Sequence, residues 1–354
     1  MREVGMPRSV CFFYLQKYKR SFPCAGGYST ITTIIHTYQD IITIENLLAT
    51  WERFLCGKRH KKDVAGFEAC LSDNLVSLHR DLLYKTYVHG PYSEFHVSDP
   101  KRRTIHKASV RDRFLHHVLY RALYPYFEER FIYDSCACRE DKGIHKALER
   151  FDSFARKVSK NNTRTCYVLK CDIKRFFASV DQKILTRIIE RNIGDRDILW
   201  LLGQVISSFH MVRSGLGLPL GNLTSQLLAN IYMHEFDMFI KQELKGKYYI
   251  RYADDFLILS DNKDYLVVLL LKIRAFLHDH LRLSLHEKKV SIESYASGVD
   301  FLGWIHFPHH RQIRTITKRR IVRNLKGYPR RETINSYRGL LQHGDTHKLK
   351  EVIF

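Results

Sequence analysis

The sequence predicts an α+β fold in which an antiparallel sheet is backed by helices. Three observations support this prediction. Hydrophobic residues make up 45% of the 354-residue chain, which is enough for a large packed core. Apolar side chains recur at helical intervals over long stretches. Short β-prone runs lie between those stretches in the second half of the chain, and no internal repeat breaks the pattern.

The first half of the chain is expected to be mainly helical. Residues 1–35 have an irregular pattern and are predicted to form an N-terminal extension. Beyond them, apolar side chains such as Ile44, Leu48 and Trp51 recur every three or four residues. A basic, strand-like stretch is expected over 94–106. The predicted helices run from residue 41 onward and over 67–83, 112–127 and 144–157.

The second half alternates between strands and helices. A short apolar strand over 166–171 ends immediately before Asp172. A glycine-rich turn over 214–221 precedes a long helix. The helices are expected over 182–191, 198–209, 222–244 and 265–280. The remaining β elements are a strand over 290–292 and a hairpin over 299–306.

A further hairpin, with two adjacent carboxylates at its tip, is predicted between the β-prone runs 248–252 and 256–259. Like charges in a partly desolvated turn repel each other, and bound divalent cations would remove that cost. Asp172 would supply a third carboxylate if its strand lies beside the hairpin. Two metal ions held about 3.5–4 Å apart can align an attacking 3′-oxygen and a leaving pyrophosphate. Taken alone, Asp254 and Asp255 also fit an ordinary turn, and Asp172 also fits a helix N-cap.

The charge balance favours a nucleic-acid partner. The chain carries 58 basic and 37 acidic residues, a formal net charge of +21. Twelve of the basic residues lie between 311 and 350, interleaved with aliphatic side chains, which suits a folded helical segment held against a phosphate backbone. A membrane partner is not expected, because the longest apolar stretch, 265–271, is far shorter than the ~20 residues of a membrane span. We therefore expect a soluble, intracellular protein.

Four segments resemble the motifs of reverse transcriptases and occur in the order that this family requires. The hairpin tip, Tyr252-Ala253-Asp254-Asp255, resembles the YxDD signature. The other three segments resemble the first palm motif, the template-and-nucleotide turn and the primer grip, and they lie at 169–177, 217–226 and 299–304. Residues 101–105 and 134–145 resemble the fingers motifs. The similarity spans roughly residues 40–350.

The resemblance implies a right-hand polymerase fold with fingers, a palm containing an antiparallel sheet, and a short helical thumb. In this chain the fingers would comprise 36–165 together with 185–215. The palm would comprise 166–305, and the basic thumb 306–354.

The resemblance also implies roles for individual residues. The metal ligands would be Asp172, Asp254, Asp255 and the carbonyl of Ile173, holding two Mg²⁺ ions with Mn²⁺ as a substitute. Lys289 would join the three aspartates as a catalytic residue by protonating the departing pyrophosphate. The nucleotide-binding residues would be Lys101, Arg103, Phe177, Leu220, Gly221 and Gln226. The primer grip would comprise Phe301, Leu302 and Gly303.

The template-and-nucleotide turn departs from the usual retroviral pattern. Leu220 stands where most retroviral-type enzymes carry Gln, and Gln226 stands where they carry Pro. This version resembles bacterial diversity-generating retroelement enzymes and the related unknown-group reverse transcriptases, several of which act in phage defence. Because Leu220 cannot hydrogen-bond near the templating base pair, we expect looser base discrimination than in an enzyme with Gln.

The resulting hypothesis is an RNA-directed DNA polymerase of the bacterial cytoplasm that acts in antiphage defence. Its partners would be a structured non-coding RNA as template or scaffold, deoxynucleoside triphosphates and the DNA product. An accessory protein or a second reverse transcriptase stays open as a further partner. Three alternatives stay open: error-prone cDNA synthesis in a diversity-generating retroelement, template-independent or protein-templated DNA synthesis, and a non-catalytic maturase-like RNA-binding protein.

Overall fold

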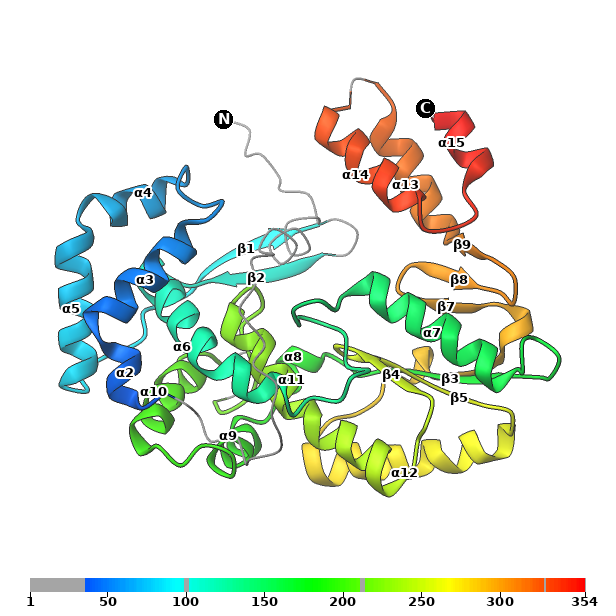
Figure 1. The fold of residues 1–354 in the computed structure, drawn as a ribbon, viewed down its shortest axis with the longest axis horizontal. Coiled ribbons are helices and arrows are strands. Elements are labelled where there is room, and N and C mark those ends of the chain that lie inside the picture. Colours follow the sequence, from blue (N-terminus) through cyan, green and yellow to red (C-terminus); the bar gives the residue numbers. More distant parts are fainter. Residues whose placement is uncertain (1–35, 99–101, 211–213, 328, 354) are drawn as a thin grey trace, which may run out of the picture.

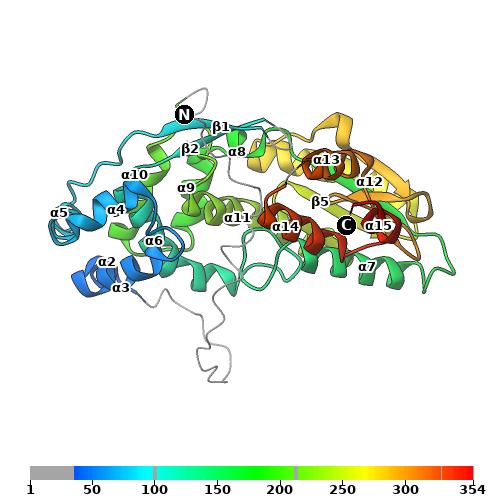
Figure 2. The ribbon, with the colours of Figure 1, turned by 90° about the horizontal axis from the view of Figure 1, so that it is seen from above.

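The computed structural model describes residues 36–98, 102–210, 214–327 and 329–353. The expected N-terminal extension, 1–35, lies outside the described residues. Figures 1 and 2 show a helical part at one end of the molecule, a sheet flanked by helices toward the other end, and small C-terminal helices beside that sheet. No helix in the described ranges combines the length and apolar composition that a membrane crossing requires.

The N-terminal part contains five helices and one hairpin among its described residues. Helix α2 begins after Thr37, whose hydroxyl and backbone exchange hydrogen bonds with Asp40 in a capping box. The ring of Trp51 packs against Phe54, Phe67 and Phe114 and joins three of the helices. The elements are α2 (Tyr38–Ile42), α3 (Ile44–Leu55), α4 (Lys62–Ala69), α5 (Leu71–Leu83), β1 (Ser93–Val97), β2 (Arg103–Lys107) and α6 (Val110–Glu128).

The central sheet is antiparallel and has the strand order β4-β5-β3-β6. Its strands are β3 (Tyr167–Asp172), β4 (Tyr249–Tyr252), β5 (Asp255–Ser260) and β6 (Ser291–Ser294). One face packs on α11 (Leu223–Met238) and α12 (Lys263–Leu281), and the other packs on α7 (Ile144–Val158). Figure 1 shows α7 and α12 on opposite sides of the sheet.

The side chains of alternate β5 residues pack on opposite faces of the sheet, as the two-residue period of a strand requires. Phe256 and Ile258 join the core that contains α11 and α12. Leu257 and Leu259 join the core that contains α7. The first core continues into the N-terminal helices, and the second continues into the C-terminal part. The sheet therefore packs against the N-terminal helices through one core and against the C-terminal part through the other.

The remaining elements lie on either side of the sheet in sequence. Between β3 and α11 come α8 (Phe176–Ser179), α9 (Gln182–Glu190) and α10 (Arg196–Ser207). A π-helical segment, η1 (Phe239–Glu243), extends α11, and a short 3-10 turn, η2 (Glu287–Lys289), precedes β6. The C-terminal part contains β7 (Val299–Phe301), β8 (Trp304–His306), β9 (Arg311–Ile313), α13 (Thr315–Leu325), α14 (Arg331–Leu341) and α15 (His347–Ile353).

The elements differ from the sequence predictions at three places. The helix predicted over 67–83 is two helices, because the chain bends at Cys70 between α4 and α5. The strand-like stretch over 94–106 is a two-stranded hairpin rather than one strand. The hairpin predicted over 299–306 is confirmed, but β9 adds a third strand to it.

Gly344 gives a direct test of how the C-terminal helices pack on the three-stranded sheet. A Cβ atom at Gly344 would lie 2.1 Å from the ring of Trp304, which is 2% exposed. We expect Gly344→Ala to lower the free energy of unfolding by about 1–3 kcal/mol, because the buried ring must move. Chemical denaturation monitored by circular dichroism measures this change.

Gly339→Ala is the matched control. Gly339 lies in α14, and a Cβ atom there meets open space. This substitution should raise stability by up to about 1 kcal/mol, since alanine favours helix more than glycine does. Equal stability of the two variants would contradict the packing described here.

Candidate active site

The three sequence-predicted aspartates meet at one edge of the central sheet. Asp172 is the last residue of β3, and its cross-strand partner is Asp255, the first residue of β5. Partners in an antiparallel pair have Cβ atoms about 4.5–5.5 Å apart. Asp254 occupies the turn between β4 and β5, and its carbonyl accepts a hydrogen bond of 3.1 Å from the backbone N–H of Ile173. Residues about 80 positions apart in the chain are therefore neighbours.

The turn that carries Asp254 has a defined backbone. Tyr252 pairs with Asp255, so only Ala253 and Asp254 connect the strands. Ala253 has a φ of +56°, a left-handed conformation at the first turn position. A positive φ there matches the right-handed twist of the flanking strands. The short loop fixes Asp254 beside the end of β3.

The electrostatics of this edge favour a bound cation. Burial is the main cause that raises the pKa of Asp255 to about 7, and the neighbouring Asp254 and Asp172 raise it further. Burial and the charge of Asp172 also raise the pKa of Asp254, against the opposing charges of Lys289 and Arg103. Several negative charges are thus held in a desolvated place, where a divalent cation would stabilise their ionised forms.

The carboxylate and carbonyl oxygens at this edge are chemically suited to Mg²⁺, but their side chains do not surround a single ion position. Carboxylate and carbonyl oxygens are the ligands that Mg²⁺ prefers. No hydrogen-bond donor among the described residues contacts the Ile173 carbonyl, which leaves that oxygen available. No set of three carboxylate, imidazole or thiolate groups in the described ranges already surrounds one ion position.

Lys289 occupies part of the coordinating capacity of Asp172. Its ammonium group donates to Asp172 Oδ2 at 2.5 Å from the end of η2. This bond uses only one of the two carboxylate oxygens of Asp172, so that a cation could bind at the other. The predicted catalytic lysine does lie at this edge.

The predicted nucleotide-binding residues lie on two segments joined by hydrogen bonds. The amide of His106 in β2 donates to the carbonyl of Leu220 at 2.9 Å, and the side chain of Asn222 donates to the His106 carbonyl at 3.0 Å. Gly221 has a φ of +107°, and a Cβ atom there would lie 2.7 Å from the Ile105 side chain. Glycine is required at this close approach.

The other predicted nucleotide-binding residues lie on different elements and differ in how deeply they are buried. Arg103 begins β2 and faces the site closely enough to act on the Asp254 carboxyl. Phe177 lies half-buried in α8, and its carbonyl accepts from Leu218 at 2.7 Å. Gln226 is half-buried in the first turn of α11. Lys101 lies outside the described residues.

The predicted primer-grip residues form the turn between β7 and β8. Leu302 and Gly303 have φ values of +48° and +93°, the pair that a two-residue hairpin turn uses. Phe301 is 1% exposed and packs against Phe151, so its side chain supports the turn from the core. Asp300 is bound by Lys170 of β3 and by Arg314, which links this hairpin to the strand that carries Asp172.

Sequence reasoning missed a buried ion pair beneath the carboxylates. Arg251 in β4 and Asp237 in α11 are both fully buried, and Arg251 Nε and Nη2 donate to the two Asp237 oxygens at 2.7 and 2.5 Å. Tyr249 donates to the same carboxylate at 2.7 Å. Arg251 Nη1 also donates at 3.2 Å to the side chain of Asn230 and to the carbonyl of Ala253.

This pair holds the turn that carries Asp254. A planar guanidinium with several fixed donors suits such a bridge better than an ammonium group does. The available signal was an Arg inside the apolar run 249–252 together with an Asp on the apolar face of a long helix, since buried charges occur in pairs.

Mg²⁺ should stabilise the protein more at pH 8 than at pH 6. The Asp255 carboxyl must lose its proton before it binds a cation, and its pKa is about 7. Thermal unfolding with and without MgCl₂ at both pH values measures this difference. An equal shift at the two pH values would contradict the assignment.

Without a metal ion, the stability of the protein should decrease as the pH rises. Between the ordinary carboxyl pKa near 4 and a pKa of about 7, folded Asp255 keeps a proton that the unfolded chain has lost. Metal-free stability should therefore fall as the pH rises through this window. Asp255→Asn should remove most of the fall.

Arg251→Lys should weaken Mn²⁺ binding by about 10–100-fold, because the Ala253 carbonyl loses its donor and the turn loses its support. Electron paramagnetic resonance of free Mn²⁺ during a titration gives the affinity. Arg191→Lys is the control, since Arg191 pairs with Glu235 on the exposed side of α11. The same Mn²⁺ affinity in both variants would show that the buried pair does not position the site.

Comparisons with known proteins indicate a family for this chain. The family model of reverse transcriptase (RNA-dependent DNA polymerase) matches residues 98–306. Protein YkfC of Escherichia coli K12 is 26% identical over 303 residues, covering 75% of this chain and 76% of YkfC. The group II intron-encoded protein LtrA of Lactococcus lactis subsp. cremoris is 22% identical over 292 residues, covering 62% of this chain and 47% of LtrA.

Solved structures of telomerase are also similar. The structure of apo telomerase from Candida tropicalis, truncated from the C-terminal domain, aligns with a TM-score of 0.49 and 14% identity, covering 65% of this chain and 55% of the telomerase chain. This chain thus spans about three quarters of YkfC but only about half of LtrA and of the telomerase chain.

The family match covers more than half of the chain and contains the central sheet, its three aspartates and the turn at Gly221. The α+β architecture, with an antiparallel sheet between helical parts and a short helical C-terminal part, is that of a right-hand polymerase. The chain belongs to the reverse transcriptase (RNA-dependent DNA polymerase) family.

Proposed function

We propose that this protein synthesises DNA on an RNA template with two Mg²⁺ ions held by Asp172, Asp254, Asp255 and the Ile173 carbonyl. The observation that carries the proposal is the register of β3 and β5, which sets Asp172 opposite Asp255 beside the turn of Asp254. When bound, the ions would activate the primer 3′-hydroxyl and neutralise the charge of the leaving pyrophosphate.

The surrounding residues have roles that follow from their positions. Lys289 lies 2.5 Å from Asp172, where its ammonium group can give a proton to the departing pyrophosphate. Arg103 lies on the β1–β2 hairpin and would bind the triphosphate together with Lys101. The ring of Phe177 would lie beneath the nucleotide sugar and exclude a 2′-hydroxyl by steric clash.

The support around the carboxylates favours a working enzyme over a vestigial site. A buried ion pair, a short turn and a cross-strand register all hold Asp254 and Asp255 where burial and neighbouring carboxylates raise the pKa of each. Buried like charges destabilise a fold unless they bind ions. A non-catalytic maturase-like protein would have no use for that arrangement.

The proposed biological setting rests on the resemblance to the unknown-group bacterial reverse transcriptases. The basic C-terminal residues 311–350 and the net charge of +21 suit a structured non-coding RNA that serves as template or scaffold. In this proposal the enzyme acts in antiphage defence in the bacterial cytoplasm. Error-prone synthesis in a diversity-generating retroelement is the alternative setting, supported by the aliphatic Leu220 in the template-and-nucleotide turn.

Asp254→Ala should lower DNA synthesis by at least about 1,000-fold, because removing a metal ligand removes several kcal/mol of transition-state stabilisation. Extension of a DNA primer on an RNA template, followed with labelled deoxynucleotides, measures the rate. Asp264→Ala is the control, since Asp264 is exposed in the first turn of α12. Comparable synthesis by the two variants would refute the metal-site assignment.

Sequencing of the nucleic acid that copurifies with the protein separates the remaining alternatives. DNA complementary to a bound RNA, absent from the Asp254→Ala preparation, is the expected result. Homopolymer or repeat DNA that matches no RNA would instead favour template-independent or protein-templated synthesis.

A further inference from the structure

A hollow of about 310 Å³ lies at the end of the central sheet that is remote from the aspartates. Asp255 begins β5, and Ser260 at the other end of the strand lines the hollow. They are five positions apart along an extended strand, which corresponds to about 17 Å. The hollow is therefore distinct from the place where a nucleotide would be added.

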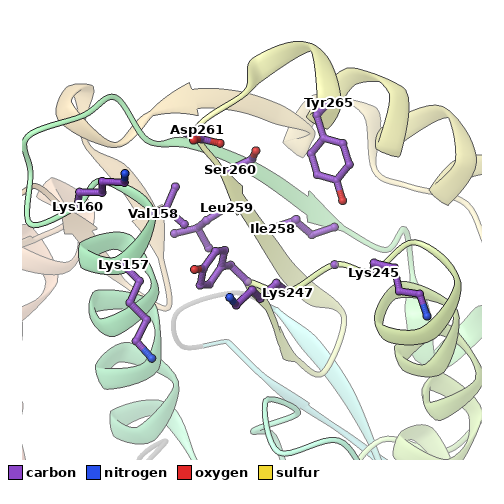
Figure 3. Close-up of a pocket in the computed structure, with 12 residues that line it drawn as sticks. Lys157, Val158, Lys160, Lys245, Lys247, Ile258, Leu259, Ser260, Asp261 and Tyr265 are labelled. Atoms are coloured by element: carbon purple, nitrogen blue, oxygen red, sulfur yellow. The ribbon is translucent and has the colours of Figure 1, made fainter.

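Four lysines surround this hollow. Lys157 and Lys160 come from the end of α7 and the turn after it, and Lys245 and Lys247 come from the connection between η1 and β4. Figure 3 shows the first two on one side and the other two across from them. Asp261 is the one acidic residue of the lining. The local charge is therefore strongly positive.

These lysines are available to an anion. All four are exposed, and no carboxylate among the described residues forms an ion pair with any of them. The C-terminal carbonyls of α7 do not offset this charge, because Ala155 and Arg156 already accept hydrogen bonds from the amides of Ser159 and Asn161.

The backbone around the lysines is fixed. Gly246 lies between Lys245 and Lys247, and its amide donates to the Ile240 carbonyl at 2.8 Å. A Cβ atom at Gly246 would lie 2.7 Å from the Ile240 side chain, so glycine permits this close return of the chain. The turn holds both lysines at the rim of the hollow.

An aromatic ring lies across the hollow from Lys157 and Lys160 (Figure 3). Tyr265 in the first turn of α12 is 38% exposed, and its hydroxyl donates to the Leu244 carbonyl at 3.2 Å. Figure 3 shows its ring at the side of the hollow opposite Lys157. A ring held by a hydrogen bond beside several ammonium groups is the combination that binds unpaired nucleotides, with the base stacked and the phosphates near the charges.

We propose that this hollow binds a single-stranded segment of the RNA partner, with phosphates at Lys157, Lys160, Lys245 and Lys247 and a base against Tyr265. The inference rests on the proposed function for the identity of the partner, because an enzyme that copies RNA encounters single strands outside its catalytic cleft. The contact would anchor the RNA on the palm, about 17 Å from the metal site.

The test measures binding of a fluorescent single-stranded RNA 20-mer while a short unlabelled RNA–DNA hybrid saturates the catalytic cleft. Lys157→Gln with Lys247→Gln should weaken binding about tenfold at physiological salt, and the slope of log affinity against log salt should become shallower by about 1.4. Lys183→Gln with Lys272→Gln removes the same charge from exposed positions on α9 and α12 and should leave binding unchanged.

Tyr265 variants test the stacking contact. Tyr265→Leu should weaken binding at least about fivefold, whereas Tyr265→Phe keeps the ring and should bind within about twofold of wild type. Equal binding by the two lysine pairs, or an equally large loss for duplex RNA, would overturn the proposal.

The rate of primer extension on a saturating short hybrid tests the proposed polymerase function separately from RNA binding in the hollow. The pocket variants should extend it as wild type does. A wild-type protein that extends no primer would refute the proposed polymerase function, while the binding comparison would still decide whether the hollow holds RNA.

Discussion

The pairing of β3 with β5 is the constraint on which the rest of the structure depends. Side chains of a strand alternate between faces, so a slip of one residue would move Asp172 from its place opposite Asp255 and would move each apolar side chain of β3 into the wrong one of the two cores. The register is held because both faces of the sheet are buried, one against α11 and α12 and the other against α7. The same strand register is therefore needed for the packing of the core and for the geometry of the site.

Two further sets of contacts stabilise this charged edge of the sheet. The Arg251–Asp237 pair is buried beneath the turn and donates to the Ala253 carbonyl, so the strand end is supported by polar contacts where apolar packing stops. The β1–β2 hairpin and the turn at Gly221 are joined by one backbone hydrogen bond and one bond from the Asn222 side chain, and the charge of Arg103 on this hairpin acts on Asp254. Contacts from both halves of the chain thus converge on one side of the sheet.

Local signals predicted much of this arrangement. The hairpin at 248–259 and the strand before Asp172 follow from short apolar runs around polar turns, and these patterns need no tertiary context. The Arg251–Asp237 pair joins two elements through side chains, so no spacing rule identifies it. The bend at Cys70 and the π-helical η1 depend on packing rather than on periodicity. The lysine-lined hollow gathers residues from α7, β5, α12 and the connection between η1 and β4, so only the folded structure reveals it.

In the proposed site, two carboxylates from the paired strands β3 and β5 and a third from the turn before β5 hold two metal ions together. Pulsed electron paramagnetic resonance of the Mn²⁺-loaded protein with a primer–template and a non-hydrolysable nucleotide measures this directly, because ions about 3.5–4 Å apart couple magnetically. The account predicts two coupled Mn²⁺ ions in the wild type and loss of the coupling in Asp172→Asn. A single uncoupled ion, or a coupled pair that survives this substitution, would contradict it.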